Sequence, residues 1–220
     1  MATIALKLDR YVTITGTLTC KSGLHIGGSK EDVEIGGMDN PIIRHPLTQE
    51  PYIPGSSLKG KLRTLLEYAE GKVETDGRGA GEPCGCGRED CLVCRVFGPH
   101  KNSNHNLGPT RIIMRDARLA DASRDELRAL QEEGLNHAEV KTENMIDRRT
   151  GVAKHPRPVE RVPAGAQFEF AASVRLFEHD DASEVLNFIR QGLDMLTKDT
   201  LGGSGTRGYG WVELDYTVHD

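Results

Sequence analysis

The sequence predicts an α+β domain in which strands and helices are separated by long insertions. Four segments have strand-like patterns, two longer segments repeat apolar residues at helical spacing, and three stretches between them fit neither pattern. A chain of 220 residues is long enough to bury a sizeable core. We therefore expect one domain over 1–220, with insertions at 21–55, 71–110 and 134–165.

Strand and helix signals follow one another in a familiar order. Strands are predicted at 10–20, 111–119, 166–177 and 211–218; the first, "RYVTITGTLTC", alternates apolar and polar residues and is rich in β-branched side chains. A short helix in "SRDELRALQEEG" has a capping box of Ser123 and Glu126 and stops at Gly134. Apart from this helix the order is β-α-β-β-α-β, the ferredoxin-like arrangement that RNA-recognition modules also use.

Two longer helices are predicted between the strands. The helix at 56–70 is expected to be capped by Ser56 or Ser57, and its apolar face comprises Leu58, Leu62, Leu65 and Leu66. The helix at 183–199 has Ser183 as its expected cap, and its apolar face comprises Leu186, Ile189, Leu193 and Leu196.

The charge of the chain is unevenly distributed. The net charge of −5 on its own argues mildly against a nucleic-acid partner, but residues 141–161 hold six Lys or Arg against three acids. No stretch approaches the ~18 apolar residues of a membrane span, and the N-terminus alternates like a strand instead of forming a signal peptide. We expect a cytoplasmic protein without a membrane partner.

Four cysteines lie close together in "PCGCGREDCLVC", namely Cys84, Cys86, Cys91 and Cys94. In a reducing compartment they suit a tetrahedral zinc site better than disulfides. Four protein ligands leave no open position for water, so Zn²⁺ would be structural and would hold the insertion together. One alternative is that the thiols are free; within a zinc site, His100 or His105 could replace a displaced cysteine. Cys20 is expected to be a thiol in the strand core.

The start of the helix at 56–70 carries Lys59, Lys61 and Arg63 where helices usually place acids. Cations at this end face the positive end of the helix dipole, which costs about 0.3–1 kcal/mol each. A bound anion would reverse the sign of the interaction. The helix start is therefore predicted to bind an anion.

Two glycine-rich segments, "GLHIGGSKEDVEIGGMDNPIIRHP" and "LGGSGTRGYG", lack the helix context of a dinucleotide fingerprint. They are interpreted either as turns and bulges or as backbone nests for phosphates, with Arg207 pairing to one phosphate. Asp39, in Asp-Asn-Pro, fits turn chemistry on its own. His25 and His155 are expected to be solvated or packed, because a single histidine more often has such a role than a catalytic one.

Four motifs in order carry a resemblance to a known family. They are "GLHIGG", "GGMDNPIIRHPLTQEPYIPGSSLKGKLRTLLE", "TENMIDRRTGVAKHPRPVERVPAGAQFEF" and "LGGSGTRGYGWV". Together they resemble the backbone subunit of type III-A CRISPR (Csm) effector complexes, in the RAMP superfamily, over nearly the whole chain. The corresponding subunit of type III-B (Cmr) complexes is also similar, but "PGSSLKGKLRTLLE" and "IDRRTG" fit the Csm version better.

The resemblance implies a subunit whose copies stack as a filament along a guide crRNA, with other Csm subunits as partners. Insertion 21–55 would be the catalytic loop, 71–110 a zinc-binding lid, and 134–165 a thumb hairpin that wedges into the guide–target duplex. Met145 and Ile146 would press on an unstacked base. The implied RNA-binding residues are Lys59, Lys61, Arg63, Arg44, Ser56, Arg148, Arg149, Arg157, Arg207 and His25.

In this family an Asp on the loop before "P-I-I-R" is needed to cut target RNA, and Asp39 matches that position. RNA supplies its own nucleophile, the 2′-OH, so a carboxylate can orient the linkage and assist deprotonation. Mg²⁺ (or Mn²⁺) would stabilise the developing charge. The expected products are a 2′,3′-cyclic phosphate and a 5′-hydroxyl.

Two features depart from the family pattern. His45 stands where an acid is common, and many relatives lack the four-cysteine insertion. One alternative is a non-catalytic subunit that only binds crRNA. Another is a stand-alone endonuclease that processes the CRISPR transcript with His25 or His155 as base.

Overall fold

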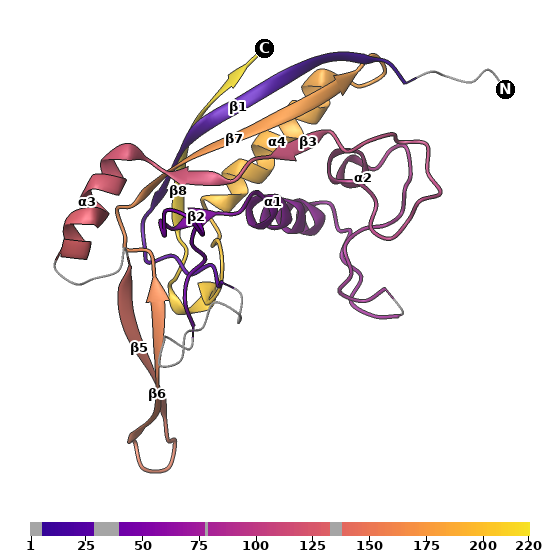
Figure 1. The fold of residues 1–220 in the computed structure, drawn as a ribbon. Coiled ribbons are helices and arrows are strands. Elements are labelled where there is room, and N and C mark those ends of the chain that lie inside the picture. The colour runs from indigo at the N-terminus through magenta and orange to yellow at the C-terminus, as the bar shows by residue number, and fades with distance from the viewer. Residues whose placement is uncertain (1–5, 29–39, 78, 133–137) are drawn as a thin grey trace.

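The computed structural model describes residues 6–28, 40–77, 79–132 and 138–220. One antiparallel sheet has the strand order β2-β4-β7-β1-β8, and β3 also pairs with β7 (Figure 1). The strands of this sheet are β1 (Leu8–Cys20), β2 (Tyr52–Ile53), β3 (Ile112–Met114), β4 (Ala117–Leu119), β7 (Gln167–Phe177) and β8 (Val212–His219). The order of β3/β4, β7, β1 and β8 is that of the ferredoxin-like fold, which confirms the predicted fold class.

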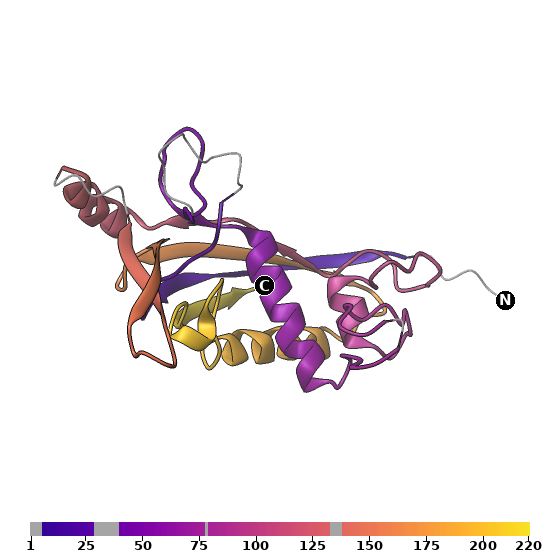
Figure 2. The ribbon, with the colours of Figure 1, turned by 90° about the horizontal axis from the view of Figure 1, so that it is seen from below.

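Two long helices, α1 (Gly55–Ala69) and α4 (Ala182–Leu196), pack against each other on one face of the sheet (Figure 2). All four predicted leucines of α1 are buried, as are Ile189, Leu193 and Leu196 of α4, whereas Leu186 is only partly buried. A Cβ atom on Gly192 would lie 2.9 Å from Leu66 Cδ1, so glycine permits the close approach of the helices here.

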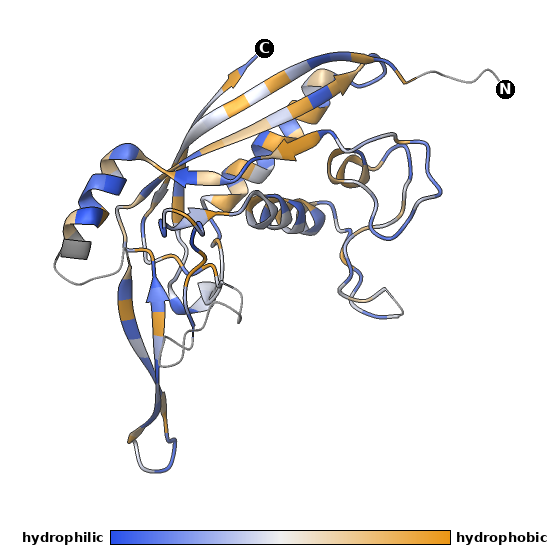
Figure 3. Ribbon diagram, viewed as in Figure 1, coloured by the Kyte–Doolittle hydropathy of each residue, from blue (hydrophilic) through white to orange (hydrophobic). Residues whose placement is uncertain are grey.

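The remaining elements lie outside the main sheet and its two long helices. They are α2 (Leu92–Phe97), α3 (Asp121–Glu132), and a hairpin of β5 (Glu139–Ile146) and β6 (Ala153–Arg161) that projects away from the main sheet (Figure 1). A short 3₁₀-helix spans Gly205–Arg207. Alternating hydropathy along β1 and β7 places one side of each strand in the core (Figure 3). Within the described residues no helix combines the length and apolar character needed to cross a bilayer.

All three predicted helix caps are wrong. Helix α1 begins at Gly55 without a side-chain cap, so Ser56 and Ser57 lie inside it. Asp181 caps α4 by accepting from the Glu184 N–H at 3.0 Å, in place of Ser183. Helix α3 starts two residues before Ser123. The Ser123 hydroxyl instead accepts from the Gln167 N–H, because it is buried against the start of β7.

The predicted strand at 111–119 is divided into β3 and β4 by a β-bulge. Going from Met114 to Arg118 advances four residues, while their partners on β7, Ala172 and Glu169, are only three residues apart. The extra residue interrupts the alternation of side chains. Arg115 and Asp116, which lie at this step, are both exposed.

A buried ion pair holds the end of insertion 71–110 to the turn before α4. Arg111 forms two hydrogen bonds to Asp180, at 2.8 and 2.9 Å, and these side chains are only 5% and 3% exposed. Arg111 also lies over the ring of Phe177, 4.7 Å from its centroid. Although burial opposes ionisation, the hydrogen bonds from Arg111 lower the pKa of Asp180.

We expect Asp180→Ala to lower the free energy of unfolding by about 3–5 kcal/mol, because it leaves the Arg111 guanidinium buried without its partner. Urea unfolding at neutral pH measures the change. Glu178→Ala is the control, since its pair with Lys7 is exposed and such pairs contribute at most about 1 kcal/mol. Equal losses for both variants would contradict this account of Asp180.

Candidate nucleic-acid interface and metal centre

The buried carboxylate of Glu160, on β6, joins the hairpin to the loop that precedes β2 and α1. It accepts a hydrogen bond from the Ile42 N–H at 2.8 Å and forms an ion pair with Arg44. The Glu160 N–H donates to the Asn40 carbonyl at 3.2 Å. These bonds hold the loop against the base of the hairpin from Asn40 onwards. Asp39, the predicted catalytic residue and the neighbour of Asn40 in sequence, lies outside the described residues.

The two glycine-rich segments meet beside the same glutamate. His25 Nδ1 lies 2.7 Å from the carbonyl oxygen of Glu160, so this nitrogen carries a proton and donates it. The His25 carbonyl in turn accepts from the Gly203 N–H at 2.8 Å. A Cβ on Gly202 would lie 2.3 Å from that carbonyl oxygen, which excludes any side chain. Close backbone packing therefore explains Gly202, while the phosphate nests stay a prediction.

The second glycine-rich segment also contacts the hairpin. Arg207 lies 3.2 Å from Glu143 of β5, and its side chain is 57% exposed. The ring of Tyr209 is buried, with Lys141 and Arg161 stacked at 4.7 and 4.6 Å from its centroid. Cation–π contacts of this kind fix the hairpin base to the segment around the 3₁₀-helix.

The hairpin exposes both cations and apolar side chains. Arg148, Arg149 and Arg157 are exposed, and Arg148 donates to the Ile146 carbonyl. Four large apolar residues are about half exposed, which is unusual outside an interface, and several lie near the tip (Figure 3): Val140, Met145, Ile146 and Val152. The Lys154 ammonium and the backbone N–H groups of Thr150 and Arg149 lower the pKa of Asp147 to about 2, so the turn keeps its charged hydrogen-bond acceptor at an acidic pH that protonates an ordinary aspartate.

The basic start of α1 already has one anion, the side chain of Asp116. Its carboxylate accepts from the Gly55 N–H at 2.7 Å and supplies the acid that the first turn of the helix lacks. Lys61 pairs with Asp199 at 2.9 Å. Arg63 pairs with the buried Glu67 and donates to the Cys84 carbonyl at 2.7 Å. Lys61 and Arg63 are therefore engaged within the protein.

Lys59 differs from its two neighbours on α1 because it has no hydrogen bond or ion pair among the described residues. Burial, together with the positive charges of Arg63 and Arg175, lowers the pKa of Lys59. An ammonium group in such a place is stabilised by an added anion. Ser56 lies one turn earlier and is exposed, so it is accessible to the same anion.

The four cysteines of insertion 71–110 come together as one cluster in which all sulfur atoms lie within 4.8 Å of one another. The distances from Cys84 to Cys94 and from Cys86 to Cys94 are 3.7 Å, and Cys84 to Cys91 is 4.0 Å. Zn–S bonds of about 2.3 Å at tetrahedral angles separate sulfur atoms by about 3.8 Å. The cluster therefore fits one tetrahedral metal ion without His100 or His105.

Helix α1 is bonded directly to this cluster. Glu67 accepts from both Arg63 and the Cys84 N–H at 2.8 Å. The segment around Cys84 is thereby attached to α1, the helix that carries Lys59.

Sequence reasoning missed Glu160 and Asp116, which position the loop and the helix. Glu160 sits among basic and apolar residues, and no local pattern marks it. Asp116 had an indirect signal, because a helix start with three cations and no acid requires an anion from elsewhere.

The chain matches one family model and several curated proteins over most of its length. The family model described as RAMP superfamily matches residues 17–213. The protein named "CRISPR system Cms endoribonuclease Csm3" of Methanothermobacter thermautotrophicus is 45% identical over 220 residues, covering 95% of this chain and 85% of the relative. A protein of the same name from Methanocaldococcus jannaschii is 41% identical over 211 residues, covering 95% of this chain and 80% of the relative.

Two solved structures share the fold. A crystal structure of the Csm3-Csm4 subcomplex in the type III-A CRISPR-Cas interference complex matches with a TM-score of 0.60 and 29% identity, covering 98% of this chain and 80% of that chain. The Methanopyrus kandleri Csm3 crystal structure matches with a TM-score of 0.64 at 24% identity, covering 94% and 75%, and supports the fold alone. The chain therefore belongs to the RAMP superfamily and, within it, to the family of Csm3 proteins.

Proposed function

We propose that this chain is the backbone subunit of a type III-A CRISPR complex. In this role it binds guide crRNA, stacks with copies of itself and other Csm subunits in the cytoplasm, and cleaves complementary target RNA through Asp39. The observation that carries the proposal is the 45% identity over almost the full chain to a protein named as a Csm3 endoribonuclease.

The described surface supports an RNA partner despite the net charge of −5. Lys59 and Ser56 at the start of α1 would meet phosphates, which need no base-specific contact. The exposed arginines of the hairpin would track the backbone, and Met145 and Ile146 would contact an unstacked base. Arg44, Lys61 and Arg63 have partners inside the protein, so we assign them to positioning the loop, helix and cluster.

Cleavage would use the 2′-OH of the target as nucleophile. This oxygen forms a new bond to phosphorus, the bond to the 5′-oxygen breaks, and the proton of the 2′-OH leaves with the assistance of Asp39. The 5′-oxygen gains a proton, which yields a 2′,3′-cyclic phosphate and a 5′-hydroxyl. Mg²⁺ or Mn²⁺, when bound, would supply positive charge to the pentavalent phosphorane. The bonds from Glu160 to Asn40 and Ile42 hold the chain that follows Asp39.

Asp39→Asn is expected to slow cleavage by about 100-fold or more, the usual contribution of a general base, and to leave target binding unchanged. Single-turnover cutting of end-labelled complementary RNA by the assembled complex, with Mg²⁺, measures the rate. Asp125→Asn, an exposed acid of α3, is the control for the change in charge. Normal cutting by Asp39→Asn would contradict the catalytic assignment.

The same assay separates the two alternatives. Wild-type complex that binds target RNA and never cuts it would identify a non-catalytic subunit. Cutting of repeat RNA by the isolated chain without metal would identify a stand-alone processing enzyme.

We further propose that the cysteine cluster binds one Zn²⁺. Elemental analysis of protein purified without chelator is expected to find about one zinc per chain, and Cys91→Ser is expected to lose it and to lower the melting temperature. Cys20→Ala removes a buried thiol outside the cluster and is expected to keep the metal. Zinc content that is unchanged in Cys91→Ser would refute the ligand assignment.

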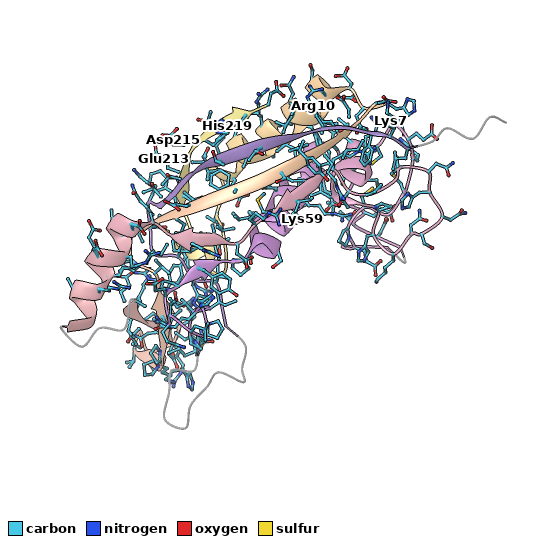
Figure 4. All side chains as sticks on the ribbon, turned by 45° about the horizontal axis from the view of Figure 1, so that its top comes forward. Lys7, Arg10, Lys59, Glu213, Asp215 and His219 are labelled. Atoms are coloured by element: carbon cyan, nitrogen blue, oxygen red, sulfur yellow. The ribbon has the colours of Figure 1, made fainter. Side chains whose placement is uncertain are left out.

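Lys59→Gln is expected to weaken binding of every single-stranded RNA by a similar factor. Removing one phosphate contact should also reduce the slope of log K against log salt concentration by about 0.7. Lys7→Gln makes the same charge change at the N-terminal end of β1, whereas Lys59 lies on α1 (Figure 4). Fluorescence anisotropy with RNAs of unrelated sequence measures both values. Identical slopes for parent and Lys59→Gln would exclude a phosphate contact.

A further inference from the structure

A cavity of about 630 Å³ lies between the loop before α1, strand β4 and the start of α3. We call it the β4 cavity. Its volume is within the usual range of small-ligand sites, about 300–1,000 Å³. Most of the lining residues have polar or charged side chains, and the full set is His45, Thr48, Glu50, Pro51, Tyr52, Arg115, Asp116, Arg118, Leu119 and Arg124. None of the sequence motifs discussed above assigns a role to this cavity.

The charges of the β4 cavity do not balance. Both acids are already engaged, since Glu50 pairs with Arg124 at 3.0 Å and Asp116 accepts from the Gly55 N–H. Arg115 and Arg118 are exposed and make no side-chain hydrogen bond or ion pair within the described part of the chain. Two arginines without a partner among the described residues therefore line the cavity, beside the N-terminus of α1.

The β-bulge explains why these two arginines share one cavity with Asp116. In a regular strand, neighbouring side chains point to opposite faces, so Arg115 and Asp116 would be separated. The extra residue between β3 and β4 breaks this alternation, and both line the same cavity. Bulges often re-aim side chains next to binding sites.

Two further residues complete a polar and aromatic lining. His45 Nδ1 accepts from the N–H groups of Leu47 and Thr48 at 3.3 and 3.4 Å, so the proton of the neutral ring is on Nε2. This nitrogen is a donor, as an anion requires. Tyr52 lies directly opposite Arg118 in the β2–β4 pair, which places a ring beside a guanidinium on the same face.

We propose that the β4 cavity is a nucleotide site for single-stranded RNA, in which Arg115 and Arg118 bind backbone phosphate, His45 donates to it, and Tyr52 stacks on the attached base. Arginine forks match phosphate geometry, and an aromatic ring accepts any base, so the site is independent of sequence. The inference rests on the proposed RNA-binding function and extends the RNA path from Lys59 to the far side of the α1 start. At position 45, where an acid is common in the family, this chain then has a histidine that donates a hydrogen bond to phosphate.

Anisotropy with labelled single-stranded RNA tests the site in the full-length chain. Arg115→Gln/Arg118→Gln is compared with Arg10→Gln/Arg190→Gln, which removes the same charge from residues outside the cavity; Figure 4 shows Arg10 on β1. The cavity variant is expected to bind RNA more weakly than the parent, and the ratio of the two affinities becomes about sevenfold smaller between about 50 and about 200 mM salt. The reason is that each lost phosphate contact reduces the slope of log K against log salt concentration by about 0.7 for single strands. The control keeps the parental slope.

Two further variants separate the ring contacts. His45→Asn keeps an acceptor for the loop N–H groups and removes the Nε2 donor, and Tyr52→Leu removes the stacking surface but keeps an apolar side chain. Both are expected to weaken RNA binding several-fold with an unchanged salt slope, because neither removes a charge. Thermal melts monitored by circular dichroism confirm that each variant is folded.

The source of the phosphate is distinguished in the assembled complex. Loss of co-purified guide RNA from the double arginine variant assigns the site to the guide. Retained guide with weaker target binding assigns it to the target strand.

Three results would overturn the proposal. A parent chain without RNA affinity would remove it together with the proposed function. Normal parental binding with no difference between the cavity and control variants would remove the proposal alone. A cavity variant that binds RNA normally and fails to assemble would also remove the proposal, since Arg115 and Arg118 would then bind an acidic protein partner.

Discussion

The candidate site depends on one buried carboxylate, that of Glu160. Its two oxygens meet Ile42 and Arg44, while its backbone bonds to Asn40 and His25. Four separate contacts thus converge on one residue of the hairpin. Breaking a buried ion pair of this kind leaves an uncompensated charge, which costs about 3–5 kcal/mol. Because of this penalty, the contacts of Glu160 hold the loop, the first glycine-rich segment and the hairpin base in one arrangement.

Pairing within the protein divides the cations into two groups. Lys61, Arg63 and Arg44 neutralise acids and hold structure. Lys59, by contrast, has no anionic partner among the described residues, and burial beside Arg63 and Arg175 lowers its pKa. Only unpaired cations gain substantially from a polyanion, since paired ones would have to give up an existing partner. An acidic chain can therefore offer a basic path to RNA.

Hydrogen bonds join the cysteine cluster to the basic helix α1. Insertion 71–110 contains little regular structure beyond the six residues of α2, so four thiolates around one ion would supply much of its order. The bonds among Arg63, Glu67 and Cys84 transmit that order to α1. In this arrangement the cluster supports the helix that carries Lys59.

The outer face of the sheet is not built like that of an RNA-recognition module. Such modules stack bases on aromatic side chains of the sheet. Here the strand positions facing away from α1 and α4 include Thr15, Thr17, Glu169 and Asp215, and the exposed ring of Tyr11 lies near the N-terminal end of β1. The edge strand β8 carries the acids Glu213 and Asp215, and His219 lies further along the same strand (Figure 4). The residues that we propose to bind RNA lie instead on the hairpin, at the start of α1 and around the β4 cavity.

Sequence alone determined the elements whose signals are local. The periodicity of the four leucines in α1 and the alternation in β1 depend only on neighbouring residues. The four candidate metal ligands are cysteines that lie within eleven positions of the chain. Tertiary structure decided the caps, the bulge at Arg115 and Asp116, and the role of Glu160. Apart from the local cap of α4 by Asp181, the side chains involved pair with backbone or charged groups far along the chain, and such a partner is chosen by packing and burial rather than by spacing.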